Sequence, residues 1–211
     1  MANDPAWCRS LSDWLSTYDG RVKRAEPQDI TDLNVFLDFR LVHGDADLID
    51  ELRRRVHASL PEERSVQYQL ARNALAFKPP IRLPGNIYLG SGADPGGRID
   101  LKDALQCLVA FARVYAARHR VDQTHTLERI VALAERDLLP PASRDEISHT
   151  YDFLMGLRLE TQMAAIREGM PPTSSAELSR LSHIQQELLR QAFGQIATLQ
   201  RKADDDFPEA G

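Results

Sequence analysis

The sequence predicts an all-α protein, and three observations predict it. Apolar residues recur at three- and four-residue intervals through most of the 211 residues. Prolines and glycines gather in residues 79–98, between two such periodic blocks, and proline pairs separate the later segments. We therefore expect an N-terminal helical subdomain over residues 1–78, a Pro/Gly-rich connection over 79–98, and a C-terminal antiparallel four-helix bundle over 99–205.

The N-terminal block divides into four expected helices. A first helix over 5–18 precedes a polar linker over 21–26, and Pro27 with Asp29 then opens a second helix that Gly44 ends. Residues 35–42 also alternate in a way that fits a strand, and helix is favoured because of the acidic opening. A third helix over 46–60 is capped by Asp45, and a fourth runs from Pro61 to about Phe77.

The connection carries the weakest helical signal of the chain. Residues 87–89 and 98–100 are expected to form a hairpin around the Gly90–Gly97 loop, a candidate hinge or lid. This loop has no Gly-Lys-Ser/Thr ending and does not lead from a strand into a helix, so a plain turn is favoured over a phosphate cradle.

Helices are expected at 101–119, 125–137, 143–168 and 175–205 in the C-terminal block. Pro140-Pro141 and Pro171-Pro172 mark two of the connections. The acidic run from Asp204 onward is expected to be a disordered tail.

Composition excludes several classes of protein. The net charge of −5 disfavours nucleic-acid binding, and no apolar run is long enough to span a membrane. The N-terminus lacks an apolar signal core, so Cys8 and Cys107 are expected to be free thiols in the cytoplasm. No cysteine or histidine pair has metal-ligand spacing, and no metal site is predicted.

Several short motifs resemble one family. They are Asp100-Leu101-Lys102, Ala112 to Ala116, Thr124 to Arg129, and Phe153 to Gln162. In this order and spacing they are similar to the nucleotidyltransferase substrate-binding domain family, the C-terminal helical part of proteins like PII uridylyltransferases. Upstream, Arg40 with Gly44-Asp45 resembles the segment that follows the catalytic core in those proteins. The resemblance implies a signalling protein, with cyclic-nucleotide-binding or CBS modules upstream in many relatives.

Nucleotidyl transfer on the resembled fold needs a Gly-Ser turn and an Asp-x-Asp pair that holds Mg²⁺. Gly90-Ser91 has no such pair a dozen residues on, and Asp45-Ala46-Asp47 has no preceding Gly-Ser turn. We therefore expect no catalytic residue here and an inactive chain. Mg²⁺ and the nucleoside triphosphate are expected only in a core upstream of residue 1, which would be a partner of this chain.

The resemblance nominates seven substrate-binding residues: Arg40, Asp45, Lys102, Arg113, Arg129, Arg158 and Gln162. Arg40 and Asp45 would face the nucleotide or brace the core, or else form a buried pair that fixes a helix corner. The later cations would form internal ion pairs, with Asp100, Glu128 and Asp152 as candidate partners, or a pocket for a phosphate or an acidic protein loop.

The sequence also departs from the family pattern at several positions. Relatives carry a Gly and a Pro near Asp103–Cys107, an Asn where His125 stands, a His where Thr161 stands, and an Asn near Thr173. Substrate recognition is therefore expected to be altered. Two other functions remain open: a module that homodimerises through an apolar face of residues 178–199, and a small-molecule binder in which Lys102, Arg113 and Arg158 converge under the glycine loop.

Overall fold

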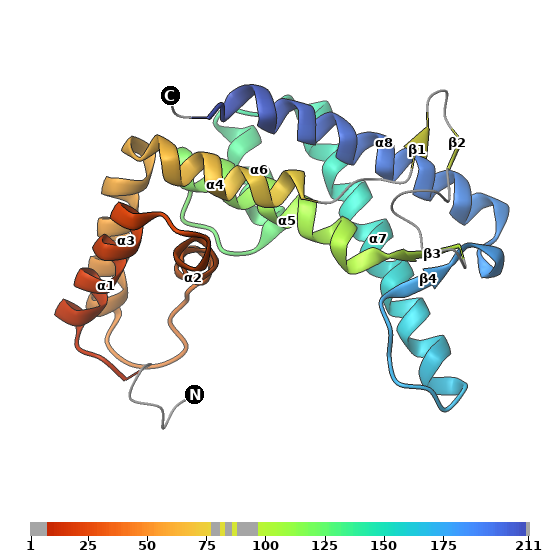
Figure 1. The fold of residues 1–211 in the computed structure, drawn as a ribbon, viewed down its shortest axis with the longest axis horizontal. Coiled ribbons are helices and arrows are strands. Elements are labelled where there is room, and N and C mark those ends of the chain that lie inside the picture. The colour runs from red at the N-terminus through yellow and green to blue at the C-terminus, as the bar shows by residue number, and fades with distance from the viewer. Residues whose placement is uncertain (1–7, 77–80, 83–85, 88–96, 210–211) are drawn as a thin grey trace.

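The computed structural model describes residues 8–76, 81–82, 86–87 and 97–209. The N-terminal part contains four α-helices and one short 3₁₀ turn. Their bounds are α1 Leu11–Arg24, α2 Pro27–Leu37, α3 Ala46–Ser59, η1 Leu60–Glu62 and α4 Arg64–Leu75. Figure 1 shows α1, α2 and α3 gathered at one end of the elongated molecule, while α4 leads away from them toward the remaining helices.

The described C-terminal part contains four helices, of which α5, α7 and α8 are longer than any N-terminal helix, and short strand segments. The strands are β1 Ile81–Arg82, β2 Asn86–Ile87, β3 Arg98–Asp100 and β4 Ser175–Glu177; the helices are α5 Leu101–Arg118, α6 Thr126–Glu135, α7 Pro141–Arg167, the 3₁₀ turn η2 Leu178–Arg180 and α8 His183–Asp206. The predicted all-α class is therefore confirmed, with two-stranded ribbons as the only sheets among the described residues.

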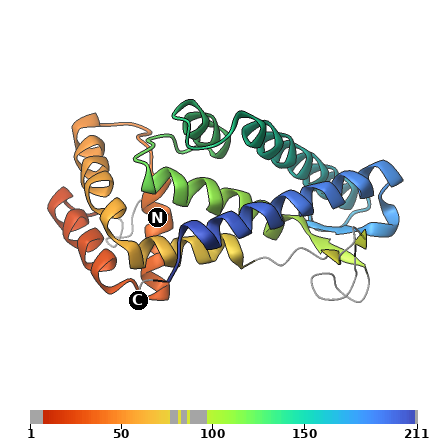
Figure 2. The same cartoon turned by 90° about the horizontal axis from the view of Figure 1, so that it is seen from above.

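Helix α5 lies at the centre of this arrangement and packs against α4, α6, α7 and α8. Figure 2 shows α6 and α7 along one side of α5, with α4 and α8 along the other. From Cys107 to Ala116 every side chain of α5 except the half-buried Val109 is buried, because this part of the helix meets other helices on several sides; Leu101, Leu108, Phe111 and Val114 are at most 1% exposed. The segment from Asp100 to Ala116, which carries two of the family-resembling motifs, therefore lies at the centre of the fold.

The first two helices differ from their predicted bounds. Helix α1 begins at Leu11, where Ser10 caps it by accepting a hydrogen bond from the Asp13 backbone, and it runs to Arg24, so the expected linker over 21–26 is mostly helical. Helix α2 ends at Leu37, and residues 38–45 form neither the expected continuation nor the alternative strand. This early end leaves Asp38 free to turn toward α5.

The predicted hairpin around the glycine loop is wrong. Strand β3 pairs antiparallel with β4, with Ile99 opposite Ala176, and β2 pairs with β1. Tyr88, Leu89 and Gly90 to Gly96 lie outside the described residues. The pairing of β3 with β4 buries Ile99 and Ala176 against the core, and neither residue was predicted to contact the other.

The last helix begins later and ends later than predicted. Ser182 and Gln185 form a capping box that starts α8 at His183, so residues 175–180 are free to form β4 and η2. The expected disordered tail is wrong as well, because Asp206 completes α8 and accepts hydrogen bonds from Tyr115 and Lys202. Phe207 is 4% exposed and lies edge-on to Tyr115.

Candidate functional site

Two of the predicted site residues, Arg113 of α5 and Arg129 of α6, meet at one carboxylate. Arg113 donates through Nε and Nη2 to Asp38, and through Nη1 to the side chain of Asn34 at 3.0 Å. Arg129 donates to Asp38 at 2.8 Å and to the carbonyls of Leu37 and Gln123. The cluster therefore ties the end of α2 to α5 and α6.

The candidate partners that the sequence suggested for these arginines were wrong. Asp38 takes that role, and it was not predicted because it lies 75 residues from Arg113. Arg113 is 8% exposed and Arg129 is 3% exposed, and the shared carboxylate offsets part of the cost of burying two cations. Burial lowers the pKa of Arg129, and Asp38 opposes that shift.

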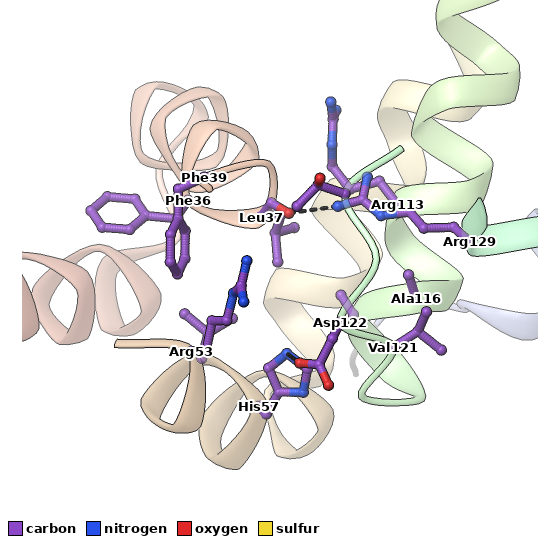
Figure 3. Close-up of a pocket in the computed structure, with 13 residues that line it drawn as sticks. Phe36, Leu37, Phe39, Arg53, His57, Arg113, Ala116, Val121, Asp122 and Arg129 are labelled. Atoms are coloured by element: carbon purple, nitrogen blue, oxygen red, sulfur yellow. Dashed lines mark hydrogen bonds and ion pairs between the residues drawn. The ribbon is translucent and has the colours of Figure 1, made fainter. Parts of the chain in front are cut away.

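Figure 3 shows a small cavity beside this cluster, bounded by Arg53 and His57 of α3 on its other side. Its volume is about 30 Å³, which fits a water molecule or two, whereas ligand pockets span roughly 300–1,000 Å³. All the guanidinium nitrogens of Arg113 and Arg129 donate to groups of the chain itself. The arginine cluster is therefore a structural clamp between helices, and the cavity beside it is too small to hold a nucleotide.

Helix α3 is held to the same corner by His57. Its Nε2 lies 3.1 Å from a carboxylate oxygen of Asp122, and its carbonyl accepts a hydrogen bond from Arg120. Burial lowers the pKa of His57; Asp122 opposes this, while Arg53, Arg120 and Arg136 add to it. The imidazole is therefore disposed to be neutral near pH 7.

The other predicted site residues do not join this cluster. Arg40, Asp45 and Lys102 are exposed, and Asp45 caps α3 through the backbone of Asp47 instead of forming a buried pair with Arg40. Arg158 donates to the Ser174 side chain at 2.9 Å, and Gln162 is half-buried one turn further along α7. Lys102, Arg113 and Arg158 do not line a common cavity among those found in the described part of the chain.

A larger groove lies between the C-terminal half of α7 and the segment that leads through β4 into α8. Its volume is about 630 Å³. Small side chains on α7 leave this space open, since Ala164 and Ala165 face residues 170–181 across it. Gly169, with φ of 73°, ends α7 and turns the chain back along the groove. Thr161 and Thr173, two of the positions that depart from the family pattern, both line it.

Hydrogen bonds to neighbouring elements hold the far wall of the groove in place. The Ser174 carbonyl accepts from the Leu101 backbone and the Leu178 backbone donates to the Gly97 carbonyl. Together with Arg158 and the β3–β4 pairing, these bonds fix residues 174–178 against the start of α5. The groove is thus bounded by rigid elements, which suits a pre-formed binding site.

The charges of the groove nearly balance. Three glutamates and two arginines line it, and Arg180 pairs with Glu168 at 2.7 Å and with Glu177 at 3.2 Å. Glu160 accepts a hydrogen bond from Gln185. Arg98 is exposed and has no ion-pair partner among the residues that the structure describes. A triphosphate would meet one unpaired cation here, whereas a peptide or a small polar molecule would meet donors and acceptors of both kinds.

Sequence reasoning missed this groove because much of its far wall, residues 175–181, comes from a segment predicted to be helix. The one available signal was the Ser182-x-x-Gln185 capping box, which places the helix start after residue 180. In the described part of the chain no three His, Cys, Asp or Glu side chains gather to hold a metal ion. Within the same residues, no helix combines the length and apolar character that crossing a membrane requires.

Comparison with known proteins gives one match. A family model described as "Putative nucleotidyltransferase substrate binding domain" matches residues 64–207, from the start of α4 to the residue after α8. The match therefore begins before the expected boundary at 79–98 and includes α4, which packs along α5. No curated protein and no solved structure matches the chain.

Proposed function

The chain belongs to the nucleotidyltransferase substrate binding domain family, and we propose that it holds the acceptor substrate while a separate catalytic core holds the nucleotide. In this division of labour the acceptor is the molecule that receives the nucleotidyl group. The groove between α7 and β4 is the proposed acceptor site. The observation that carries this proposal is a groove of ligand size with nearly balanced charge, inside the matched region.

The charge of the groove favours the acceptor over the nucleotide as its occupant. Phosphate groups are usually held by several unpaired arginines, lysines or backbone amides. Here Arg180 is engaged with two glutamates, and Arg98 alone is unpaired among the described lining residues. The arginine cluster at Asp38 is cationic but has a cavity of about 30 Å³. A protein segment, with its own donors, acceptors and apolar groups, fits the larger groove better.

The finer features of this proposal follow the resemblance. The core would be similar to that of PII uridylyltransferases, would lie upstream, and would supply Mg²⁺-dependent transfer from a nucleoside triphosphate. The chain by itself would be inactive. A cytoplasmic signalling protein with CBS or cyclic-nucleotide-binding modules would be its setting.

Isothermal titration calorimetry of the chain with ATP and with UTP, each with and without Mg²⁺, tests the division of labour. We expect no binding heat in any of the four titrations. Micromolar binding that Arg98→Ala abolishes would contradict the proposal, because the groove would then hold the nucleotide. Micromolar binding that Arg113→Ala abolishes would contradict it too, and would place the nucleotide at the Asp38 cluster.

Selection of a displayed random-peptide library on the chain tests the groove itself. The variant Ala164→Trp fills the groove, and Ala142→Trp is the matched control because Ala142 is exposed in the first turn of the same helix. We expect peptides that bind the wild-type chain and Ala142→Trp but not Ala164→Trp. Peptides that bind all three proteins equally, or no enrichment at all, would contradict a peptide acceptor in this groove.

A further inference from the structure

Helix α7 exposes a continuous apolar stripe. Met155, Leu159, Met163 and Ile166 are 39%, 57%, 42% and 59% exposed. At 100° per residue they fall within about 80° of one another around the helix. Met170, just past the helix end, is 60% exposed. The chain has four methionines, and all but Met1 are in this set of five residues, which we call the α7 stripe.

The exposed area of the α7 stripe is large enough for a specific interface. The five side chains together expose on the order of 500 Å², comparable with the largest apolar patch of a typical monomer. Two such stripes facing each other would bury about 1,000 Å², the lower limit for a specific interface. Figure 2 shows α7 at one edge of the molecule, next to α6, with α4, α5 and α8 on its inner side.

The charged residues next to the α7 stripe favour a second copy of this chain as the partner and an antiparallel orientation of the two α7 helices. Asp152 lies in line with the stripe just before Met155, and Arg167 lies near its other end, about 60° further round the helix; the two are 15 residues or about 22 Å apart. Both are exposed, and neither has an ion-pair partner in the described part of the chain. In an antiparallel pair of identical helices that crosses near Leu159, Asp152 of one copy would come level with Arg167 of the other. A parallel pair in register would instead bring Asp152 level with Asp152 and Arg167 level with Arg167.

We propose that two copies of this chain associate through their α7 stripes, with the two α7 helices antiparallel and crossing near Leu159. Methionine suits such a contact because its flexible, polarizable side chain adapts to a facing surface. The apolar face of residues 178–199, the earlier candidate for dimerisation, contributes Leu189, Phe193 and Ile196 to the core of the same chain. Most of the groove opens on another side of α7, since Ala164 lies roughly 100° from Met163, and Met170, past the end of the helix, borders both surfaces.

Sedimentation velocity of the full chain, from about 1 to 200 µM, tests the proposal. We expect the sedimentation coefficient to rise from that of a monomer to that of a dimer. Leu159→Glu should weaken dimerisation at least about tenfold, since it places two charges beside the two-fold axis. Val42→Glu is the control, because Val42 is 88% exposed on the loop before α3 and lies outside the α7 stripe.

Charge reversal tests the orientation independently of folding. Asp152→Arg alone and Arg167→Asp alone should each weaken the dimer several-fold, and the double variant should restore it. In a Cys8→Ser background, a short bis-maleimide should link two copies of Leu159→Cys but not two copies of Met155→Cys. Linkage of both cysteine variants would overturn the antiparallel arrangement.

Two outcomes of the sedimentation experiment would overturn the proposal as a whole. The first is a monomer at every concentration. The second is a dimer that Leu159→Glu leaves as stable as the Val42→Glu control, which would mean that another face mediates the association.

Discussion

Arg113 and Asp38 are 75 residues apart in the sequence and joined by two hydrogen bonds. The same carboxylate binds Arg129, so one acidic side chain at the end of α2 accompanies two buried guanidinium groups from the central helix and its neighbour. This relationship links the first three helices to the matched domain by charge as well as by apolar packing. Removing the Asp38 carboxylate should therefore lower the stability of the whole chain.

Replacing Asp38 with alanine should lower the free energy of unfolding by about 2–3 kcal/mol. Breaking a buried pair costs about 3–5 kcal/mol because the remaining charge is uncompensated, and Asp38 is 38% exposed, which reduces the effect. Urea denaturation followed by circular dichroism measures the change. Asp145→Ala is the control, because Asp145 pairs on the surface with its neighbour Arg144 and should change stability by less than about 0.5 kcal/mol. Equal effects of the two variants would contradict the clamp.

Stability should fall as the pH is lowered from about 7.5 to 5.5. Burial lowers the pKa of both His57 and His119 in the folded chain. The unfolded chain, with histidine pKa values of about 6.5, then binds protons more readily, so this contribution is complete above that pH and is lost below it. The measurement is the melting temperature across this range. The variant His57→Gln/His119→Gln should show a shallower dependence, and an unchanged slope would contradict this account.

Phe207→Ala should destabilise the chain by about 3 kcal/mol, the usual cost of removing a buried phenyl ring. Phe207 is 4% exposed and contacts Tyr115, with the Arg118 guanidinium over its ring. Pro208, the next residue, is exposed, and Pro208→Ala is expected to have little effect. Thermal unfolding of both variants distinguishes an anchored end of α8 from the disordered tail that the sequence suggested.

Ser182→Ala should cost about 1 kcal/mol, because it removes the side-chain acceptor for the Gln185 backbone amide at the start of α8. The nearby Ser179→Ala removes a hydroxyl that bonds only to the Glu177 side chain on the surface, and should be close to neutral. Denaturant unfolding compares them. A neutral Ser182→Ala would mean that tertiary contacts alone fix where α8 begins.

Local sequence signals predicted the helices, but they could not predict which distant segments contact each other. Helix α5 begins at Leu101 as expected, where Asp100 caps it, and Pro141 begins α7. Strands β3 and β4 span three residues each and lie 75 residues apart, so no local periodicity marks their pairing. Arg113 and Arg129 could be nominated because they match the resembled family, and a cation in an apolar segment needs a partner. Asp38 could not, because its role depends on α2 ending at Leu37.

The groove between α7 and β4 also could not be predicted from local sequence signals. Thr161 and Thr173 were marked by their departure from the family pattern, and the structure brings both to one surface. The space between them depends on β4 standing away from α7, which follows from tertiary hydrogen bonds to Gly97 and Leu101. A sequence pattern can therefore nominate residues, but the hollow between them is a property of the packing.

The central position of α5 also has a consequence for biosynthesis. Helix α8 covers one side of α5 and of α4, and its first residue is His183. A nascent chain on the ribosome would have made α4 and α5 long before α8 emerged, and their apolar faces would be uncovered during that interval. Such intermediates attract chaperones and aggregate readily. The helical domain therefore completes its folding only after α8 has been made, which favours expression conditions that slow translation or supply chaperones.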